Sequence, residues 1–393
     1  MKNWISSASE WMQRGAMGLG FSLVLLGTST GAAMAQGASP ETVKTTEAPA
    51  VPAAVVPAVK SDAPLLPSSV TLTPSAKAQF ERQAVQPGNN APTWREVNSG
   101  KEHYTSIPGG ERGVLIQSNG QAWRLIRNGQ ISLYGGIVLA AVASLIMLTF
   151  WVKGPILLPE PRTGRLIERF TSAERMAHWS VAISFVTLAI TGLVLIFGKY
   201  VLLPVFGYTL FAWLAILCKN VHNFIGPLFG ASLVVFFIMY VKDNFPNASD
   251  IKWLLKGGGL FSDGHVPSGR FNMGEKLWFW GGLTFLGIVV TASGMVMNFP
   301  NFEQSRFIMQ QANIIHGIAT LIFITMSLGH IYIGSIGMEG ALEGMRYGFV
   351  DETWAKVHHE DWYNDIVEGR VPAVRTPEGA NTLGSQAFKP ARA

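Results

Sequence analysis

The stretch ANIIHGIATLIFITMSLGHIYIGSIGM, residues Ala312–Met338, combines a long apolar run with two histidines, His316 and His330. A run of about 20 mostly apolar residues is long enough to cross a hydrocarbon core of roughly 30 Å as a helix. Ionisable side chains at membrane depth are costly, so a functional role is the first hypothesis for each of them. Imidazole is also the usual nitrogen ligand of haem iron. The stretch therefore predicts a transmembrane helix that presents two candidate metal ligands.

Other apolar runs of similar length indicate that the whole chain belongs in a membrane. Charged residues make up 14% of the chain, against an average of about 25% in soluble domains. The net charge of +5 indicates no nucleic-acid partner, because the basic residues lie in loops beside the apolar runs. We predict an integral all-α membrane protein surrounded by membrane lipid. Its predicted spans are Ile131–Val152, Met176–Gly198, Asn220–Val241, Leu277–Phe299 and Ala312–Met338.

The N-terminal third has a different composition. Basic residues, an apolar run and the small residues before Gln36 follow the order of a cleavable signal peptide over residues 1–35, with an uncleaved anchor as the alternative. Residues 36–130 are rich in Ala and Pro and predict an exported, flexible segment. A Ser-Asn-Gly sequence between two apolar stretches of residues 109–129 predicts a small ordered hairpin within it.

The loops between the predicted spans differ in their content of Lys and Arg. Residues 153–175 and residues 242–276 hold five basic residues each, whereas residues 199–219 hold two and the last loop holds Arg306 alone. Because short cytoplasmic loops carry the excess of basic residues, we predict that the richer loops face the cytoplasm. This orientation implies the bacterial inner membrane, a periplasmic N-terminal segment and a cytoplasmic C-terminal tail over residues 341–393.

The segment between the second and third spans is too apolar for an ordinary loop. Residues 199–219 predict a helix that lies in the outer interface of the membrane. Several tryptophans lie near predicted span ends, where an aromatic belt is expected. They are Trp179, Trp213, Trp278 and Trp280.

The predicted topology sorts four histidines by depth. His178 begins an outward-running span and His222 begins an inward-running one, so they lie near the cytoplasmic and outer faces respectively. The fourteen residues from His316 to His330 rise roughly 21 Å and return to within about 40° of the same helix face. We therefore predict an outer pair, His222 with His316, and an inner pair, His178 with His330.

This spacing suits a four-helix bundle over residues 163–340 that holds two non-covalent b haems, with residues 131–152 as an extra N-terminal transmembrane helix. Arg175, three residues before His178, is a candidate partner for a haem propionate, or an ordinary basic residue at the cytoplasmic boundary. Cys218 is the single cysteine, which excludes a Cys-ligated cluster and a covalent haem. It lies one helical turn before His222 and is interpreted as a small buried residue, with support of His222 as the alternative.

Other interpretations of these residues remain open. A single intramembrane histidine often only donates a hydrogen bond to a neighbouring helix, worth about 0.6 kcal/mol. A proton-coupled transporter with a histidine relay predicts a colourless protein, and a structural anchor predicts no redox role. Glycines in the spans allow close approach of either a helix or a porphyrin; they are Gly192, Gly226, Gly230, Gly281, Gly282, Gly317 and Gly329. The histidines outside the spans are predicted to be surface residues; they are His103, His265, His358 and His359.

Five motifs resemble the gamma, cytochrome b, subunit of membrane-bound respiratory formate dehydrogenase. They are RFTSAERMAHW (Arg169–Trp179), KNVHNFIGP (Lys219–Pro227), GRFNMGEK (Gly269–Lys276), the His316 and His330 pair, and DETWAKVHHEDWY (Asp351–Tyr363). The resemblance covers roughly residues 163–372. Cytochromes b of hydrogenases and sulfur-compound reductases share the first motif and the paired histidines, so a hydrogenase or other periplasmic oxidoreductase is the nearest alternative. The signal peptide, exported segment and fifth span depart from the short form of the family.

The resemblance implies an electron-transfer and quinone-reducing subunit of a respiratory chain. Formate oxidation would reside on a molybdenum or tungsten catalytic subunit, reached through an iron–sulfur subunit. The quinone would bind beside the inner haem, near Asn272, Gly274 and His330. By themselves, Asn272 and Gly274 predict only the cap of a helix that begins near Glu275.

Overall fold

The computed structural model describes residues 103–104, 114–116, 119–256, 266–302 and 304–389. The predicted signal peptide and nearly all of the exported segment lie outside these residues. The chain divides into two compact units, residues 32–122 and a larger unit formed mainly by Trp123–Ala393. In the smaller unit, β1 (His103–Tyr104) pairs antiparallel with β2 (Val114–Ile116).

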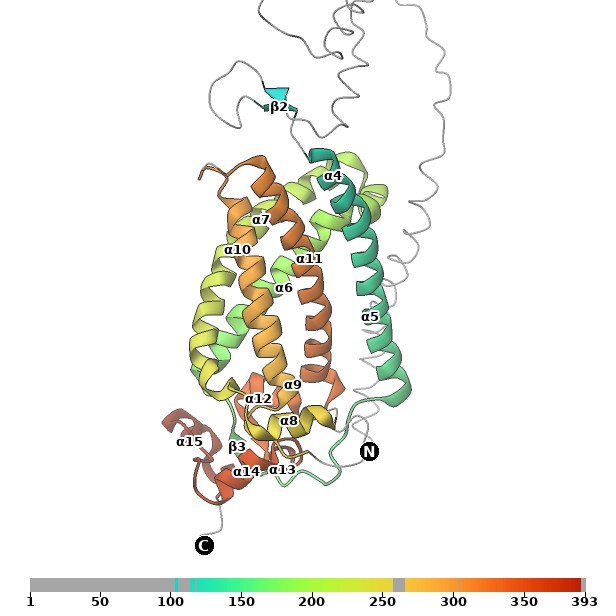
Figure 1. Cartoon of the computed structure of the whole chain (residues 1–393). Coiled ribbons are helices and arrows are strands. Elements are labelled where there is room, and N and C mark those ends of the chain that lie inside the picture. Colours follow the sequence, from blue (N-terminus) through green and yellow to red (C-terminus); the bar gives the residue numbers. More distant parts are fainter. Residues whose placement is uncertain (1–102, 105–113, 117–118, 257–265, 303, 390–393) are drawn as a thin grey trace, which may run out of the picture. The chain divides into compact units, whose positions relative to one another are not determined.

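Five helical segments among the described residues are long and apolar enough to cross a membrane. They confirm the five predicted spans and the all-α membrane class, and they run alternately up and down (Figure 1). The segments are Gly120–Lys153 (α4 Gly120–Leu125, η2 Ile126–Ile131, α5 Ser132–Lys153), Ser172–Val201 (α6), Leu203–Asn244 (α7 Leu203–Tyr240, η3 Val241–Asn244), Met273–Asn298 (α9 Met273–Leu277, η5 Trp278–Leu286, α10 Gly287–Asn298) and Arg306–Gly337 (α11 Arg306–Tyr332, η6 Ile333–Gly337).

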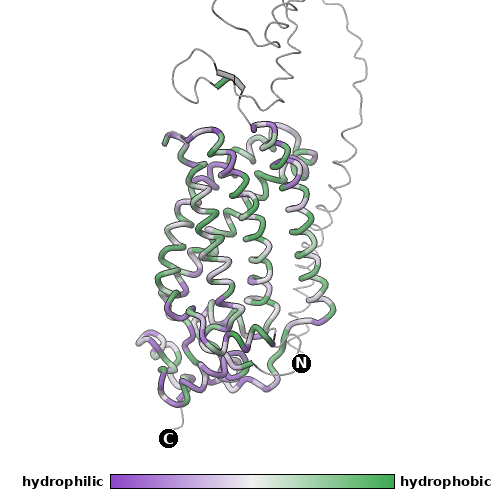
Figure 2. Tube along the Cα trace, viewed as in Figure 1, coloured by the Kyte–Doolittle hydropathy of each residue, from purple (hydrophilic) through white to green (hydrophobic). Residues whose placement is uncertain are grey.

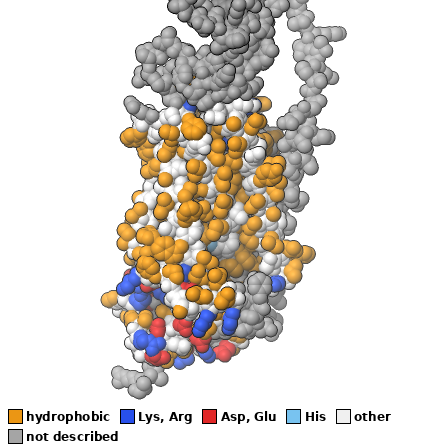
Figure 3. All heavy atoms as spheres, in the orientation of Figure 1, with side chains coloured by type: hydrophobic (Ala, Val, Ile, Leu, Met, Phe, Trp, Pro, Cys, Tyr) orange, Lys and Arg blue, Asp and Glu red, His pale blue; other side chains and the backbone are white. Residues whose placement is uncertain are grey.

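Side-chain chemistry marks the two ends of the bundle. On the face seen in Figure 3, apolar side chains cover its length, and charged side chains gather at the end where α8 (Ala248–Leu255) lies. The trace in Figure 2 is likewise mostly hydrophobic along the helices and hydrophilic at that end. We call this the cap end, and the opposite end, where α10 ends and α11 begins, the far end. Three helices at the cap end begin at a polar N-cap residue. The side chains of Thr171, Asn247 and Asn272 each form a capping box with an acidic residue three positions later.

Two local predictions differ from the structure. Residues 199–219 are helical, but the chain turns at Gly207, whose φ of 71° favours glycine, and the residues beyond it continue in α7 to Tyr240. Their position in the membrane interface stays a prediction. The hairpin across Ser-Asn-Gly is absent, because Gly120 begins α4, which runs on into the first span. In both places an apolar segment that looks local joins a long helix.

The residues after the last span fold into a cap. Strand β3 (Leu166–Glu168) pairs antiparallel with β4 (Phe349–Asp351), with Ile167 opposite Val350. Both of these side chains are fully buried, in a core that includes Trp354 and Trp362. The cap also contains α12 (Ala341–Tyr347), α13 (Glu352–His358), α14 (Glu360–Val367), α15 (Pro377–Leu383) and η7 (Gly384–Gln386). The predicted C-terminal tail is thus packed against the loop that precedes the second span.

His359 lies at the centre of this cap, contrary to the prediction of a surface position. It is 1% exposed; its Nδ1 lies 2.8 Å from the carbonyl of Gly269, to which it donates, and its Nε2 accepts from the Arg169 guanidinium at 3.0 Å. The same guanidinium donates to Glu275 at 2.9 Å. Burial and the neighbouring Arg169 lower the pKa of His359 to about 3, so the imidazole is neutral. The tail therefore fastens the loop before α9 through a neutral, doubly hydrogen-bonded histidine.

Acidification is expected to loosen the cap through His359. An unfolded-state histidine titrates near pH 6.5, whereas folded His359 has a pKa of about 3. Between these values the unfolded chain binds more protons, so the free energy of unfolding decreases as the pH falls from about 6.5 toward 3. Limited proteolysis of the cap at a series of pH values measures this slope. In His359→Gln the slope should flatten; an unchanged slope would assign it to other groups.

Candidate cofactor site

The structure brings the four intramembrane histidines together in two pairs. The ring centroids of His222 and His316 are 6.1 Å apart, and those of His178 and His330 are 6.3 Å apart. Each pair joins two helices: α7 with α11 in the outer pair, and α6 with α11 in the inner pair. These are the pairs predicted from depth. Their role as iron ligands stays a prediction.

Hydrogen bonds orient both rings of the outer pair. The Thr191 hydroxyl donates to the Thr187 carbonyl at 2.8 Å, so it accepts from the Nδ1–H of His222, also at 2.8 Å. His316 Nδ1 lies 3.0 Å from the carbonyl of Val290, which only accepts. Both imidazoles therefore carry their proton on Nδ1 and keep the Nε2 lone pair free. This is the arrangement usual for metal-ligating histidines.

The inner pair shows a different sign of a missing partner. The Nδ1 atom of His178 is buried and has no hydrogen-bond partner among the described residues. A buried polar atom without a partner costs about 1–3 kcal/mol. His330 stacks on Trp278, with centroids 5.0 Å apart and planes 16° apart. His330 is exposed in the structure. The inner pair thus has unsatisfied polar capacity and open space beside it.

The spacing of both pairs fits one metal ion between two imidazoles. With metal–nitrogen distances of roughly 2.0–2.1 Å, two facing imidazoles have centroids about 6 Å apart. The observed centroid distances of 6.1 Å and 6.3 Å match this value without any movement of the helices. The histidines therefore fit the axial ligation of two haems.

Glycines clear space beside the outer pair. A Cβ on Gly192 would lie 3.4 Å from the His222 ring, and a Cβ on Gly294 would lie 3.2 Å from the His316 ring. Gly192 was singled out in the sequence, whereas Gly294 was missed. A cavity of about 400 Å³ includes both histidines and both glycines in its lining. The outer pair thus lies at a largely apolar cavity that is open to a flat ligand.

A proline within α7, Pro227, lines the same cavity. Pro227 in α7 has no N–H to donate to the carbonyl of Asn223, one turn earlier. The side-chain amide of Asn298, at the end of α10, donates to this carbonyl at 3.0 Å instead. The carbonyl of Asn223, which Pro227 leaves without its helical donor, is therefore satisfied by Asn298. Cys218, on the preceding turn, is buried, as interpreted from the sequence.

Aromatic side chains fill the interval between the two pairs. Phe185 packs on Phe323 with centroids 4.7 Å apart, and Phe323 lies 5.7 Å from Trp278, which in turn stacks on His330. Phe185 and Phe323 also line the cavity beside the outer pair. A packed apolar interior thus separates the two sites and excludes water between them.

Trp278 is not a belt residue, because its ring faces the inner pair. It begins η5, a π-helical turn, a form that is rare and often found at functional sites. A Cβ on Gly282 would lie 2.4 Å from the Trp278 ring, so only glycine leaves room for the indole. Gly282 was singled out in the sequence, but its role was missed. Because it has no side chain, it leaves room for the Trp278 ring to stack on His330.

Gly282→Ala is therefore expected to displace the indole and to change the midpoint potential of a haem bound at the inner pair. Overpacking of this kind costs about 1–3 kcal/mol. Gly281→Ala is the matched control, because a Cβ there meets nothing within 4 Å. Potentiometric titration of both variants measures the effect. Equal behaviour of the two variants would show that the stacked tryptophan does not influence the site.

The remaining predicted site residues make local structural contacts. Asn272 caps α9: its side chain accepts from Glu275 N at 3.0 Å. A Cβ on Gly274 would lie 3.0 Å from Trp253 of α8, so this position is closely packed. Arg175 donates to the carbonyl of Arg346 at 3.0 Å and to the hydroxyl of Ser172 at 3.1 Å. The quinone and propionate roles of these residues stay predictions.

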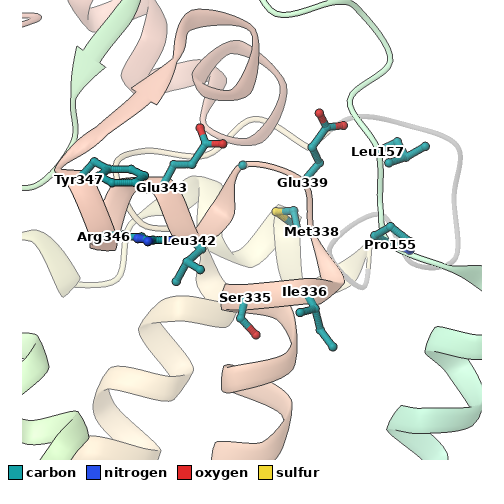
Figure 4. A pocket seen from close by; sticks show the side chains of 11 residues that line it. Pro155, Leu157, Ser335, Ile336, Met338, Glu339, Leu342, Glu343, Arg346 and Tyr347 are labelled. Atoms are coloured by element: carbon teal, nitrogen blue, oxygen red, sulfur yellow. The ribbon is translucent and has the colours of Figure 1, made fainter. Parts of the chain in front are cut away.

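A second cavity, of about 350 Å³, lies at the cap end (Figure 4). Pro155 and Leu157 approach it from the segment after α5, and Met338, Leu342 and Tyr347 approach it from the start of the cap (Figure 4). Its acidic residues Glu339 and Glu343 form ion pairs with Arg162. Among the described residues that line it, none is a predicted ligand.

Comparison with known proteins agrees with the helical membrane fold. A sequence family described as prokaryotic cytochrome b561 matches residues 169–348. Together with the helical bundle, this match defines a membrane cytochrome b. The chain is 30% identical over 204 residues to the cytochrome b556(fdo) subunit of formate dehydrogenase from Escherichia coli K12, which covers 51% of this chain and 93% of that relative. The chain therefore belongs to the family of formate dehydrogenase cytochrome b subunits, as the motifs indicated, and this membership implies haem b.

Two further relatives have similar coverage. The nitrate-inducible cytochrome b556(Fdn) subunit of Escherichia coli K12 is 28% identical over 209 residues, 52% of this chain and 93% of the relative. The formate dehydrogenase cytochrome b556 subunit of Haemophilus influenzae is 27% identical over 233 residues, 56% of this chain and 91% of the relative. In each case the relative matches little more than half of this chain. The rest of the chain is therefore interpreted from its own residues.

Proposed function

We propose that this chain is the quinone-reducing cytochrome b subunit of a formate dehydrogenase complex in the bacterial inner membrane. It holds two b haems, one between His222 and His316 and one between His178 and His330. It links formate oxidation on a periplasmic catalytic partner, through an iron–sulfur subunit, to quinone on the cytoplasmic side. The observation that carries the proposal is the meeting of the four intramembrane histidines in two pairs, with ring centroids 6.1 Å and 6.3 Å apart.

The chain's own residues supply ligation, orientation and a dry interior. Haem b, when bound, accepts and releases one electron at a time. Thr191 and the Val290 carbonyl hold the outer imidazoles with Nε2 free, and Trp278 fixes the ring plane of His330. The phenylalanines between the pairs exclude water. Charge separated between the two faces of the membrane is worth about 2.3 kcal/mol per elementary charge per 100 mV.

The cap end is suited to quinone chemistry. Asn272 and Gly274 lie at the start of the helix that continues to Trp278, and Trp278 stacks on His330. The buried contact of His359 with the Gly269 carbonyl fastens the loop just before this helix. We place the quinone between this helix start and His330, where protons from the cytoplasm are close. The packed cap then determines the shape of the loop that binds it.

The donor is tested by purifying the native complex and assaying a quinone analogue with formate and with hydrogen. Formate-dependent reduction, without hydrogen-dependent reduction, is the expected result. Hydrogen-dependent reduction alone would assign the chain to the hydrogenase alternative. The absence of any haem from the purified complex would overturn the cytochrome assignment and favour the transporter with a histidine relay. Full electron flow to quinone in His316→Ala would favour the structural anchor.

A further inference from the structure

The additional N-terminal helix is built into the wall of the outer cavity. Trp123 donates through its indole N–H to the Asn313 side chain of α11 at 3.1 Å. Tyr200, at the end of α6, donates to the carbonyl of Asn128 at 3.1 Å. A Cβ on Gly135 would lie 2.3 Å from the side chain of Leu321, so α5 and α11 approach as closely as glycine permits. Two residues of this segment, Arg127 and Ile131, line the cavity.

The cavity has a polarity that selects a particular kind of ligand. Its body is apolar, and its charged lining residues are Arg127 and Lys219; the described residues of the lining include no carboxylate. The asparagines of the lining, Asn223, Asn298 and Asn313, belong to the far-end parts of α7, α10 and α11. Arg127 and Lys219 belong to the same end, because Arg127 precedes the contact with Tyr200 and Lys219 precedes His222 by one turn. An apolar slot with two cations at one end complements a flat apolar molecule with carboxylates along one edge.

We propose that the additional helix completes the outer haem pocket and that Arg127, together with Lys219, neutralises the carboxylates of the haem held between His222 and His316. This inference rests on the proposed function and concerns a helix that precedes the family match, which begins at residue 169. Arg127 donates to the Asn128 side chain at 2.8 Å, which orients its guanidinium. Its other N–H groups are available for a carboxylate, since a guanidinium has five.

The physical reason for such a cation is the cost of a charge in an apolar pocket. A carboxylate removed from water is unfavourable unless it is paired and hydrogen-bonded. Arginine is the best-matched partner, because its donors align with both carboxylate oxygens. A positive charge beside the haem also favours the reduced form, so Arg127 raises the reduction potential of the outer haem. Arg127 is thus a positioning and tuning residue rather than an iron ligand.

The test is a redox titration of the purified full-length protein with Arg127→Gln, Arg127→Lys and Arg124→Gln. In Arg127→Gln the one-electron reduction equilibrium of the outer haem should move about tenfold toward the oxidised form, a downward shift of about 59 mV. Arg127→Lys keeps the charge and should restore most of the potential. Arg124→Gln is the matched control, because Arg124 lies one turn earlier, is exposed and is not part of the cavity lining. It should cause little shift.

A second set of variants assigns the shift to one site. In a His222→Ala background, where the inner haem alone remains, adding Arg127→Gln should leave the potential unchanged. Shifts of both haems by the same amount, or no shift in Arg127→Gln, would overturn the inference while two haems in the wild type keep the proposed function. A shift that occurs only when anionic lipid is present would assign Arg127 to a lipid headgroup and also overturn it. No haem in the wild type would contradict the proposed function itself.

Discussion

Replacing His316 by alanine is expected to remove one of the two proposed haems from each polypeptide. His222→Ala should remove the same haem, because both rings face one gap of 6.1 Å between centroids. His178→Ala and His330→Ala should each remove the other haem, because their rings share the second gap of 6.3 Å. A haem without covalent attachment depends on both axial ligands and on packing, so loss of one ligand is severe. Pyridine haemochrome content and reduced-minus-oxidised spectra measure the result.

The double variants make this prediction sharper than the single ones. His222→Ala with His316→Ala should lose no more haem than either single variant, because both act on one site. His222→Ala with His178→Ala should lose both haems. Thr191→Val, which removes the acceptor of the His222 Nδ1–H, should keep the haem and change its potential. Loss of both haems in every single variant would instead indicate a general collapse of the bundle. Full haem content in every variant would contradict the ligand assignment.

The depth of each histidine in the membrane could be predicted from the sequence, because every residue of a helix adds the same rise along its axis. The position of His316 relative to His330 depends only on the rise per residue, and the positions of His178 and His222 depend on which way each span runs. No contact between distant residues is needed for this argument. For the same reason, the capping role of Asn272 followed from residues within one turn of it. These predictions needed only local geometry and an alternating topology.

The features that were missed depend on distant contacts. His359 is buried because Arg169 and Gly269 meet it from segments 190 and 90 residues away in the sequence. Its pattern, a histidine in a polar tail, is identical to that of a surface residue. Trp278 faces the inner pair because a π-helical turn redirects the side chains of its helix, and Gly282 leaves room for the ring. The family-like motif DETWAKVHHEDWY (Asp351–Tyr363) was the signal in the sequence that this tail differs from an ordinary surface segment.

The segment between the second and third spans shows a different limit. Residues 199–219 are apolar enough for either a surface-lying helix or the start of a long span, and composition is the same in both cases. The backbone turn at Gly207, with its φ of 71°, decides the outcome. A single glycine in an apolar segment does not identify the position of a turn. Helix boundaries near the membrane surface are therefore predicted less well than the spans themselves.

Glu174→Ala is expected to be among the most destabilising single substitutions in the cap. The Glu174 carboxylate is buried and accepts from Arg270 at 2.9 Å and from Arg375 at 2.7 Å. It also completes the capping box at the start of α6 with Thr171. Removing it leaves two arginines near each other without their shared anion. Breaking a buried ion pair in this way costs about 3–5 kcal/mol of folding free energy. Loss of the capping box at the start of α6 adds to this cost.

The position of Glu174 explains why the effect should reach the site. Arg375 belongs to the C-terminal segment, Arg270 precedes Asn272 by two residues, and Glu174 begins the helix that carries His178. One carboxylate therefore joins the tail, the loop before α9 and a ligand-bearing helix. Glu378→Ala is the control, because Glu378 is exposed and its carboxylate accepts a single surface hydrogen bond from the Ser172 hydroxyl, at 2.9 Å. Such surface substitutions usually change stability by less than about 0.5 kcal/mol.

Two measurements separate a local from a general effect. Equilibrium unfolding in detergent should show the decrease in the free energy of unfolding, and trypsin should cleave near Arg375 much faster in Glu174→Ala than in Glu378→Ala. Glu174→Gln keeps an acceptor for the Thr171 N–H and should fall between the two. Because His178 follows on the same helix, the inner haem should be lost at a lower temperature than the outer haem. Equal thermal stability of the two haems in Glu174→Ala would show that the ion network stabilises the cap without positioning the inner pair.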